Sequence, residues 1–305
     1  MLLMGSDGAE ISRLKQEMKS RFEIDDLGEA KYILGLEISR DHEKKLIKLS
    51  QPTGLEKCLR TYRALNARAR EKCVPLSPNV ETDADNDAIE TKYPYREAVG
   101  AQVYLAMCTR PDLAVAVSSH ASYCNRPTKR AWKRVMQTFK YMNVTRDAGI
   151  VYDGRVAKRN VIEVYVDADH ASDKATRRSR TGFIAMMNGG PISWCSRLQS
   201  IVALSSTEAE YYAMTDATQE ALWLRSLLTE LGFMQHGATV VYEDNKGARD
   251  LCKNPVYQKR TRHIEVKYHF VRRHVKDGTI EVCGVPSKLQ LADFFDQTVA
   301  VCRVG

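Results

Sequence analysis

The sequence predicts an α/β protein in which a mixed sheet flanked by helices follows a smaller α+β region. Two observations lead to this fold class. Residues 160–305 alternate strand-like runs with helical patterns in the order three strands, helix, strand, helix, strand, helix, which is typical of a sheet with helices packed on it. Residues 1–150 have two short strand-like runs among longer helical patterns. A polar stretch at 153–160 separates the two parts, so we expect two domains, 1–150 and 160–305.

The composition is that of an ordinary globular protein. The 305 residues are 44% hydrophobic and 28% charged, and the longest apolar runs fall well short of the ~18 residues that a membrane span needs. The first residues lack a signal-peptide pattern, so we expect neither a membrane-spanning nor a secreted protein. The eight cysteines are scattered singly, which disfavours a zinc site and indicates reduced thiols inside the cell. The net charge of +8 makes polyanions plausible partners.

The spacing of apolar residues predicts the elements of the first part. Helices are predicted at 11–22, 55–62, 98–117 and 130–142, and strands at 32–38 and 46–49. The helix at 130–142 is strongly basic. The acidic stretch at 77–91 lacks the central glycine of a calcium loop, and we expect a solvated loop there.

The second part is predicted in the same way. Strands are predicted at 161–167, 181–187 and 192–196, with a turn at 188–191 between the last two. A long helix begins near Ser205 and Ser206, whose hydroxyls can cap it, and ends before Gly232. A strand at 239–243, a short helix from 245, a basic helix reaching 277, a strand at 279–285 and a short helix from 289 complete the chain.

Four acidic residues of the second part stand at positions where a charge is costly. Asp167 and Asp244 each close an otherwise apolar strand, and Asp293 lies between apolar neighbours on the last helix. At about 100° per residue, Glu210 shares the core-facing stripe of the long helix, whereas Glu208 lies on a more polar face. Buried carboxylates lower stability unless they are paired or bind a cation.

A single acid of this kind is more often an ordinary cap or a surface residue, but four of them on strand, helix, strand and helix favour a common site. Carboxylates without cysteine or convincing histidine ligands are typical of sites for Mg²⁺ or Mn²⁺. The stretch at 285–290, just before the last of the four acids, contains no histidine that could act as a base beside them. We therefore assign no catalytic histidine.

Several motifs carry a resemblance to one family. They are Tyr-Val-Asp-Ala-Asp-His-Ala at 165–171, Ala-Leu-Ser-Ser-Thr-Glu-Ala-Glu-Tyr at 203–211, Glu-Asp-Asn-Lys-Gly-Ala at 243–248 and Leu-Ala-Asp at 291–293, with shorter matches at 178–182, 191–196, 260–265 and 268–270. In order and spacing they resemble the ribonuclease H domain of copia-type LTR retrotransposon Pol polyproteins. The first part is similar to the C-terminal thumb and connection region of reverse transcriptase in the same polyproteins. The matching stretches are 22–28, 34–38, 49–51, 95–100, 104–106 and 109–113.

The resemblance implies a ribonuclease H-like fold and a metal-dependent endonuclease that hydrolyses the RNA strand of RNA–DNA hybrids during retrotransposon reverse transcription. The family holds two Mg²⁺ ions, for which Mn²⁺ can substitute, on an Asp-Glu-Asp-Asp set. These catalytic ligands fall on Asp167, Glu210, Asp244 and Asp293, the same four acids. The implied partners are an RNA–DNA hybrid and the upstream polymerase portion of the polyprotein. The implied location is intracellular, in cytoplasmic virus-like particles, with the nucleus as a second place.

Candidate nucleic-acid-binding residues are polar and basic side chains within or beside these motifs: Arg178, Ser206, Asn245, Arg262 and Lys267. Residues 253–276 hold eight basic residues against one acid. This basic surface either contacts phosphates or is simply solvated, and the sequence leaves both open. Further basic clusters lie at 177–180 and at 129–140, the latter including Arg134.

The chain also departs from the family. The Tyr-Val-Asp-Asp polymerase motif does not occur, so we expect no polymerase activity from this chain. His170 replaces a tryptophan, Glu243 stands beside Asp244 in place of a small or apolar residue, and Asp296 begins a pair that is Thr-Lys in the family. Two alternatives to an active nuclease stay open: a catalytically inert retrotransposon remnant, and a domesticated protein that binds nucleic acid without cleaving it.

Overall fold

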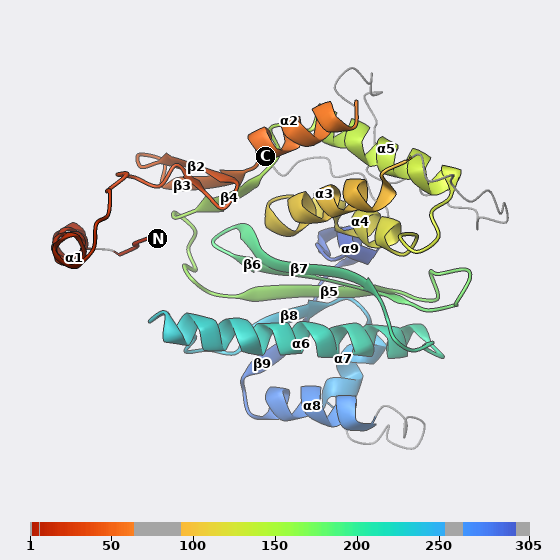
Figure 1. Cartoon of the computed structure of the whole chain (residues 1–305). Helices are drawn as coiled ribbons and strands as arrows, with labels where there is room; N and C mark the ends of the chain where they lie inside the picture. Colours follow the sequence, from red (N-terminus) through yellow and green to blue (C-terminus); the bar gives the residue numbers. More distant parts are fainter. Residues whose placement is uncertain (1, 6, 64–92, 254–264, 297–305) are drawn as a thin grey trace.

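Two regions, each built on its own sheet, pack against each other (Figure 1). The computed structural model describes residues 2–5, 7–63, 93–253 and 265–296. Among these residues, no helix combines the length and the apolar composition that crossing a bilayer requires.

The first region contains a four-stranded sheet and a cluster of helices. Its elements are α1 (Gly8–Arg21), β1 (Tyr32–Ile33), β2 (Leu36–Asp41), β3 (Leu46–Ser50), α2 (Pro52–Thr61), α3 (Tyr95–Cys108), α4 (Ala114–Ala121), α5 (Lys129–Val144) and β4 (Ile150–Asp153). The strands pair antiparallel in the order β1-β2-β3-β4. Apolar faces of α2, α3 and α5 form a core in which Leu59, Leu105 and Phe139 are buried.

The strand β4 does not follow from the sequence pattern. Its four residues pair with β3, where Leu46 lies opposite Asp153. A pattern this short is not distinguishable from a loop, and a partner strand about a hundred residues earlier in the chain decides its conformation. The first region therefore continues through Asp153.

Two elements that the sequence predicts as continuous are divided. The expected strand at 32–38 is interrupted by a turn in which Leu34 and Gly35 have φ of +48° and +75°. The expected helix at 98–117 ends at Cys108 and resumes in α4, because Pro111 starts a short 3₁₀ turn between them. Proline cannot donate a helical hydrogen bond and restricts the residue before it, so the prediction of one helix is wrong there.

The second region contains a five-stranded mixed sheet. Its elements are β5 (Glu163–Asp169), β6 (Arg180–Met187), β7 (Gly190–Leu198), α6 (Ser206–Glu230), β8 (Thr239–Glu243), α7 (Lys246–Lys253), α8 (Glu265–Lys276), β9 (Ile280–Gly284) and α9 (Asp293–Asp296). The strand order is β7-β6-β5-β8-β9, with β5, β6 and β7 antiparallel and β5, β8 and β9 parallel. The predicted series of strands and helices is confirmed, and with it the mixed sheet flanked by helices.

Helices cover both faces of this sheet. In Figure 1, α6, α7 and α8 lie on one face and α9 lies on the other. The small apolar stripe of α6, with Ala213 and Ala217 fully buried, packs on Val164, Val166 and Val241 of the sheet. This packing sets the position of the first turns of α6 relative to the ends of β5 and β8.

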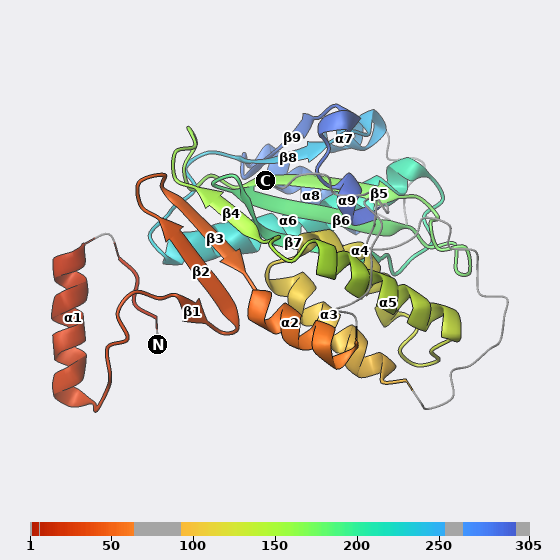
Figure 2. The same ribbon diagram turned by 90° about the horizontal axis from the view of Figure 1, so that it is seen from above.

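The two regions are joined by direct hydrogen bonds. The helices α3 and α4 lie over the same sheet face as α9, in Figure 1 and, seen from above, in Figure 2. The indole N–H of Trp194 in β7 donates to the carbonyl of Ala106 (3.0 Å), and the guanidinium of Arg180 in β6 donates to the Ser118 hydroxyl (2.9 Å). The first region is therefore a structural cover for this face of the second sheet.

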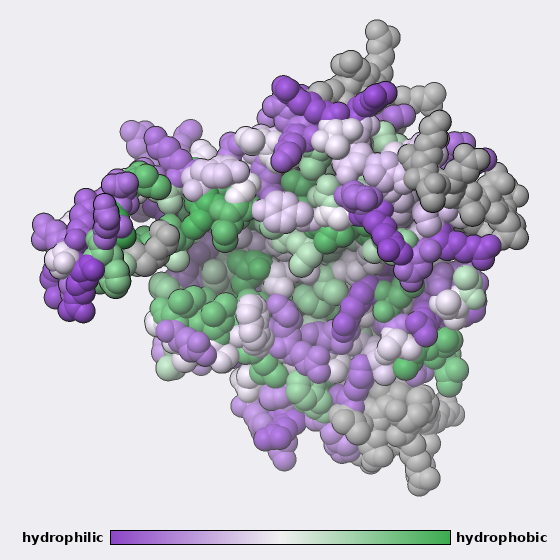
Figure 3. Space-filling model, in the orientation of Figure 1, coloured by the Kyte–Doolittle hydropathy of each residue, from purple (hydrophilic) through white to green (hydrophobic). Residues whose placement is uncertain are grey.

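Polar and apolar side chains are unevenly distributed over the face that Figure 3 shows. Hydrophilic side chains dominate the outer surface of α1. Apolar side chains gather at the C-terminal end of α6, where Trp223, Leu231 and Phe233 are each more than half exposed. This apolar surface lies at the opposite end of α6 from Glu210.

Candidate metal centre

Three carboxylates meet where two parallel strands end and α6 begins. Asp167 lies in β5, Asp244 directly follows β8, and Glu210 stands in the second turn of α6. A carboxylate oxygen of each lies within 4.8 Å of those of the other two. Because β5 and β8 are parallel neighbours, their carboxyl ends meet at one edge of the sheet, and α6 brings Glu210 to that edge.

The fourth predicted ligand, Asp293, joins this group as the first residue of α9. Burial, the charge of Asp167, a hydrogen bond with that carboxyl and the charge of Asp244 raise the pKa of Asp293 to about 7. The structure thus brings together all four acids that the sequence singles out, from elements that are far apart in the chain. Their roles as ligands stay predictions.

The cluster brings together more carboxylates than its surroundings can balance in their ionised form. The side chain of Glu210 is only 5% exposed, and its Oε2 has no hydrogen-bond partner among the described residues. Burial first, and then the charges of Glu243, Asp167 and Asp244, raise the pKa of Glu210 to about 12. A divalent cation would offset this repulsion and satisfy the orphaned oxygen. A donor set made only of carboxylate oxygens fits Mg²⁺ or Mn²⁺ and does not fit a soft cation.

The two acids at the start of α6 are used differently, as their helix faces predict. Glu210 points into the cluster. The backbone N–H of Glu208 donates to the Ser205 hydroxyl (3.2 Å), and its carboxylate accepts from the N–H of Leu204 (2.8 Å). Together these two hydrogen bonds close the start of the helix, which is why Glu208 is buried although it is not in the cluster.

A fifth acid, Glu243, is more deeply placed than the sequence analysis expects. Its side chain is fully buried, with Oε1 accepting from the backbone N–H of Asn245 (2.9 Å). Burial and the charges of Asp167 and Asp244 hold its pKa well above the ordinary value, although that hydrogen bond opposes the shift. The signal that finds it is alternation, because Thr239, Val241 and Glu243 all face inward on β8.

A hydroxyl that the sequence analysis misses also contacts the cluster. Ser287 donates to Oδ2 of Asp244 at 2.6 Å. Three residues later, the carboxamide of Gln290 is buried and donates to the carbonyl of Val166 in β5 (2.9 Å). The segment before Asp293, in which the sequence offers no histidine, thus ties the ends of β8 and β5 together.

Three predicted nucleic-acid-binding residues lie on or beside the elements that carry Asp167, Glu210 and Asp244. Ser206 is exposed as the first residue of α6, and Arg178 is exposed between β5 and β6. Asn245 follows Asp244, and its Oδ1 accepts from the N–H of Ala248 in the first turn of α7 (3.0 Å). The Asn245 side chain therefore already has a structural role as a helix cap.

The other basic residues that the sequence analysis singles out differ in their surroundings. The ammonium of Lys267 lies 3.2 Å from the ring centroid of Tyr212, and burial lowers its pKa. Arg262 lies outside the described residues. Arg134 is only 7% exposed and lies over the Tyr123 ring, so its assignment to a surface cluster is wrong. Helix packing, which a charge count does not register, accounts for this difference.

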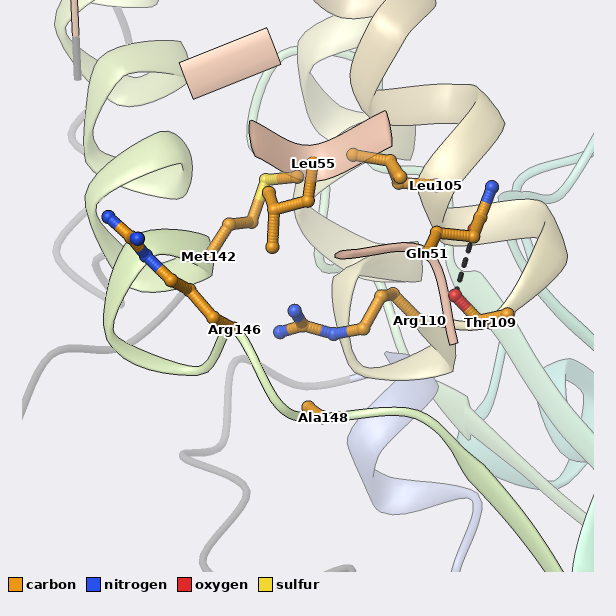
Figure 4. A pocket seen from close by; sticks show the side chains of 8 residues that line it. All are labelled: Gln51, Leu55, Leu105, Thr109, Arg110, Met142, Arg146 and Ala148. Carbon is orange, nitrogen blue, oxygen red and sulfur yellow. Dashed lines mark hydrogen bonds between the residues drawn. The ribbon is translucent and has the colours of Figure 1, made fainter. Parts of the chain in front are cut away.

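A small cavity in the first region is a structural feature and not a ligand site. Figure 4 shows the side chains that line it, which are Gln51, Leu55, Leu105, Thr109, Arg110, Met142, Arg146 and Ala148. Its volume of about 10 Å³ leaves room for about one water. The Thr109 hydroxyl donates to Oε1 of Gln51 across it (2.8 Å).

The Thr-Arg-Pro-Asp-Leu motif beside this cavity holds a buried ion pair. The guanidinium of Arg110 contacts the Asp112 carboxylate at 2.6 Å and donates to the backbone carbonyl of Thr145 (3.1 Å). Its carbon lies 5.5 Å from the ring centroid of Tyr141 in α5. The motif thus fastens the break between α3 and α4 to the end of α5.

The chain is similar over nearly its whole length to transposon polyproteins. It is 36% identical to the retrovirus-related Pol polyprotein from transposon TNT 1-94 of Nicotiana tabacum, over 98% of this chain and 23% of that protein. It is 35% identical to the retrovirus-related Pol polyprotein from transposon RE2 of Arabidopsis thaliana, over 96% of this chain and 20% of that protein. The chain therefore spans about a fifth of the length of these relatives. No protein-family model matches it.

A solved structure shares the overall fold. The foamy viral protease-reverse transcriptase in complex with dsDNA matches 92% of this chain and 52% of its own, with a TM-score of 0.51 and 12% sequence identity. The match includes both regions of this chain, so their arrangement also occurs in another protein.

Proposed function

We infer the function of this chain from its family, because it belongs to the copia-type retrotransposon Pol polyproteins. We propose that it is a metal-dependent endonuclease that hydrolyses the RNA strand of RNA–DNA hybrids during retrotransposon reverse transcription. Its substrate is then the hybrid, its partner is the polymerase portion of the polyprotein, and its place is inside the cell.

The group of Asp167, Glu210, Asp244 and Asp293 is the observation that carries this proposal. The carboxylates of Asp167, Glu210 and Asp244 lie within 4.8 Å of one another, and Glu210 has an orphaned oxygen. Such an arrangement destabilises the fold unless cations bind. A purely structural acid would have a basic or hydrogen-bonding partner. The cluster is therefore better explained as a site for two Mg²⁺ ions, with Mn²⁺ as a substitute.

The residues of the chain hold this site in place from rigid elements. When bound there, divalent cations lower the pKa of water and stabilise charge on the leaving oxygen of a phosphodiester. Asp167 and the end of β8 are held by the central strands of the sheet. The Ser205–Glu208 cap holds the first turn of α6 and with it Glu210, and the Ser287 hydroxyl orients the Asp244 carboxylate.

The charge of the chain supports a polyanionic substrate. A net charge of +8 and exposed basic residues such as Arg178 favour phosphate contacts. Contacts of this kind release counterions, so hybrid affinity should fall steeply with salt and depend little on sequence. A flat salt dependence between low and physiological ionic strength would contradict this part of the proposal.

The test is cleavage of an RNA–DNA hybrid by the full chain with Mg²⁺ or Mn²⁺. Four variants each replace one acid of the group by its amide: Asp167→Asn, Glu210→Gln, Asp244→Asn and Asp293→Asn. Each should lower the cleavage rate at least ~10²-fold, because the lost contact stabilises the transition state by a few kcal/mol. Glu208→Gln is the matched control. A glutamine keeps the cap, so most of the activity should remain.

The outcome also separates the alternatives. If the unmodified chain binds hybrids but cleaves none with either cation, the nucleic-acid-binding alternative replaces the nuclease. If it neither binds nor cleaves, the chain is an inert remnant. Loss of cleavage in Glu208→Gln together with full activity in Glu210→Gln would show that the helix-face assignment is wrong.

A further inference from the structure

Glu243 is a buried acid that the four-carboxylate site does not use. It is the last residue of β8 and faces inward in line with Val241, which packs in the core between the sheet and α6. It immediately precedes Asp244, and no part of its side chain is exposed to solvent. An acid in such a place requires an explanation, because an unpaired buried carboxylate is strongly destabilising.

The hydrogen bonds of Glu243 satisfy only half of its carboxylate. The N–H of Asn245 donates to Oε1 (2.9 Å), while Oε2 has no partner among the described residues. The nearby guanidinium of Arg249 donates instead to the backbone carbonyls of Glu243 (2.6 Å) and Asp244 (2.8 Å). Its positive charge is near, but its hydrogen bonds do not reach the carboxylate oxygens.

The Glu210 carboxylate provides a second orphaned oxygen. Oε2 of Glu210 is also buried and without a partner in the described part of the chain. Among the charged neighbours that act on Glu210, Glu243 has the largest effect, ahead of Asp167 and Asp244. Two buried acids therefore each keep a carboxylate oxygen for which the described residues offer no donor.

We propose that Glu243 is a fifth carboxylate of the cation site, which binds a hard divalent cation from the inner side together with Glu210. This inference rests on the proposed function, because it assumes that the acid cluster holds such cations. Oxygen ligands of this type match Mg²⁺ and Mn²⁺. An added negative ligand strengthens cation binding by both charge and ligand number, so this chain should bind Mn²⁺ more tightly than a variant with only four carboxylates.

The experiment measures Mn²⁺ binding to the full chain by titration calorimetry, without nucleic acid. Glu243→Gln keeps the shape of the side chain and removes its charge, and should weaken Mn²⁺ binding by at least ~10-fold. Glu281→Gln is the matched control, because Glu281 is an exposed acid on the adjacent strand β9. Its Mn²⁺ affinity should equal that of the unmodified chain. Glu243→Asp keeps the charge on a shorter side chain and should bind with intermediate affinity.

Thermal unfolding with and without Mn²⁺ provides a second measurement. The shift in melting temperature that Mn²⁺ produces should be smaller in Glu243→Gln than in the unmodified chain. If Glu210→Gln weakens Mn²⁺ binding and Glu243→Gln does not, the inference is overturned while the four-carboxylate nuclease stands. If the unmodified chain binds Mn²⁺ without cleaving hybrids, the proposed function fails, and an affinity loss in Glu243→Gln still supports the inference.

Discussion

The two regions of the molecule bury charged side chains in opposite ways. In the first region, the charges of Arg110 and Asp112 are paired at 2.6 Å. In the second region, Glu210 and Glu243 are buried with other carboxylates as neighbours and with unpartnered oxygens. A paired charge keeps elements in register, whereas a group of like charges lowers stability and persists only if it has another use. The difference separates a structural motif from a candidate site.

Breaking the structural pair should give the largest effect on stability. Asp112→Asn leaves the Arg110 guanidinium buried without its counter-charge, so the free energy of unfolding should fall by about 3 kcal/mol. Urea unfolding of the full chain measures it. The double variant Arg110→Met, Asp112→Leu removes both charges and should recover most of the loss. A single variant as stable as the unmodified chain would show that the pair is not structural.

A substitution at the edge of the acid cluster should weaken cation binding and leave the stability of the fold nearly unchanged. Ser287→Ala removes the donor to Asp244 and should raise the Mn²⁺ dissociation constant about 10-fold, with little change in the melting temperature of the metal-free chain. Ser287→Thr keeps a hydroxyl and should restore the affinity. The exposed Ser226 on α6 provides the control, Ser226→Ala. Equal Mn²⁺ affinities in Ser287→Ala and the control would remove Ser287 from the site.

A smaller effect is expected from pH in the absence of divalent cations. Because the pKa of Asp293 is raised from 3.8 to about 7, the folded chain holds this proton more tightly than the unfolded chain does. Its contribution to stability is therefore complete below about pH 4 and is lost as the pH rises through about 7. Melting temperatures in EDTA should show the unmodified chain losing stability relative to Asp293→Asn over this range. A difference that does not change with pH would contradict the prediction.

The smallest effect belongs to an ion pair at the surface. Arg60 and Glu56 on α2 form a contact of 2.5 Å, but their side chains are 69% and 50% exposed. Arg60→Ala should change the free energy of unfolding by less than about 0.5 kcal/mol, because water screens the charges. If urea unfolding gives a loss as large as that of Asp112→Asn, burial is not what distinguishes the two pairs.

Local sequence patterns were sufficient to predict the long helices and strands and to single out the four acids. The alternation of Thr239–Glu243 and the spacing along Ser206–Glu230 repeat over enough residues to identify β8 and α6. The same spacing distinguishes Glu210 from Glu208. Strand ends and helix stripes are local properties, so the acids on them can be recognised before the fold is known.

Other features could not be predicted because remote partners determine them. The strand β4 exists through its pairing with β3, and Arg134 is buried by the packing of α5 against its neighbours. The contact of Ser287 with Asp244 joins residues 43 positions apart. Local sequence patterns carry no information about contacts between residues that are far apart in the chain.

The sequence by itself determined the order of the elements, the helix face of Glu210 and the four acids, because hydrophobic period and the cost of a buried charge act within a few residues. Only the tertiary structure decided that Asp167, Glu210 and Asp244 lie within 4.8 Å of one another, that Glu243 is fully buried beside them, and that Arg110 is paired. These outcomes depend on how the parallel strands β5 and β8 align and on how α6 packs across them. The distance between two charges, and therefore whether they repel, pair or bind a cation, is a property of that packing.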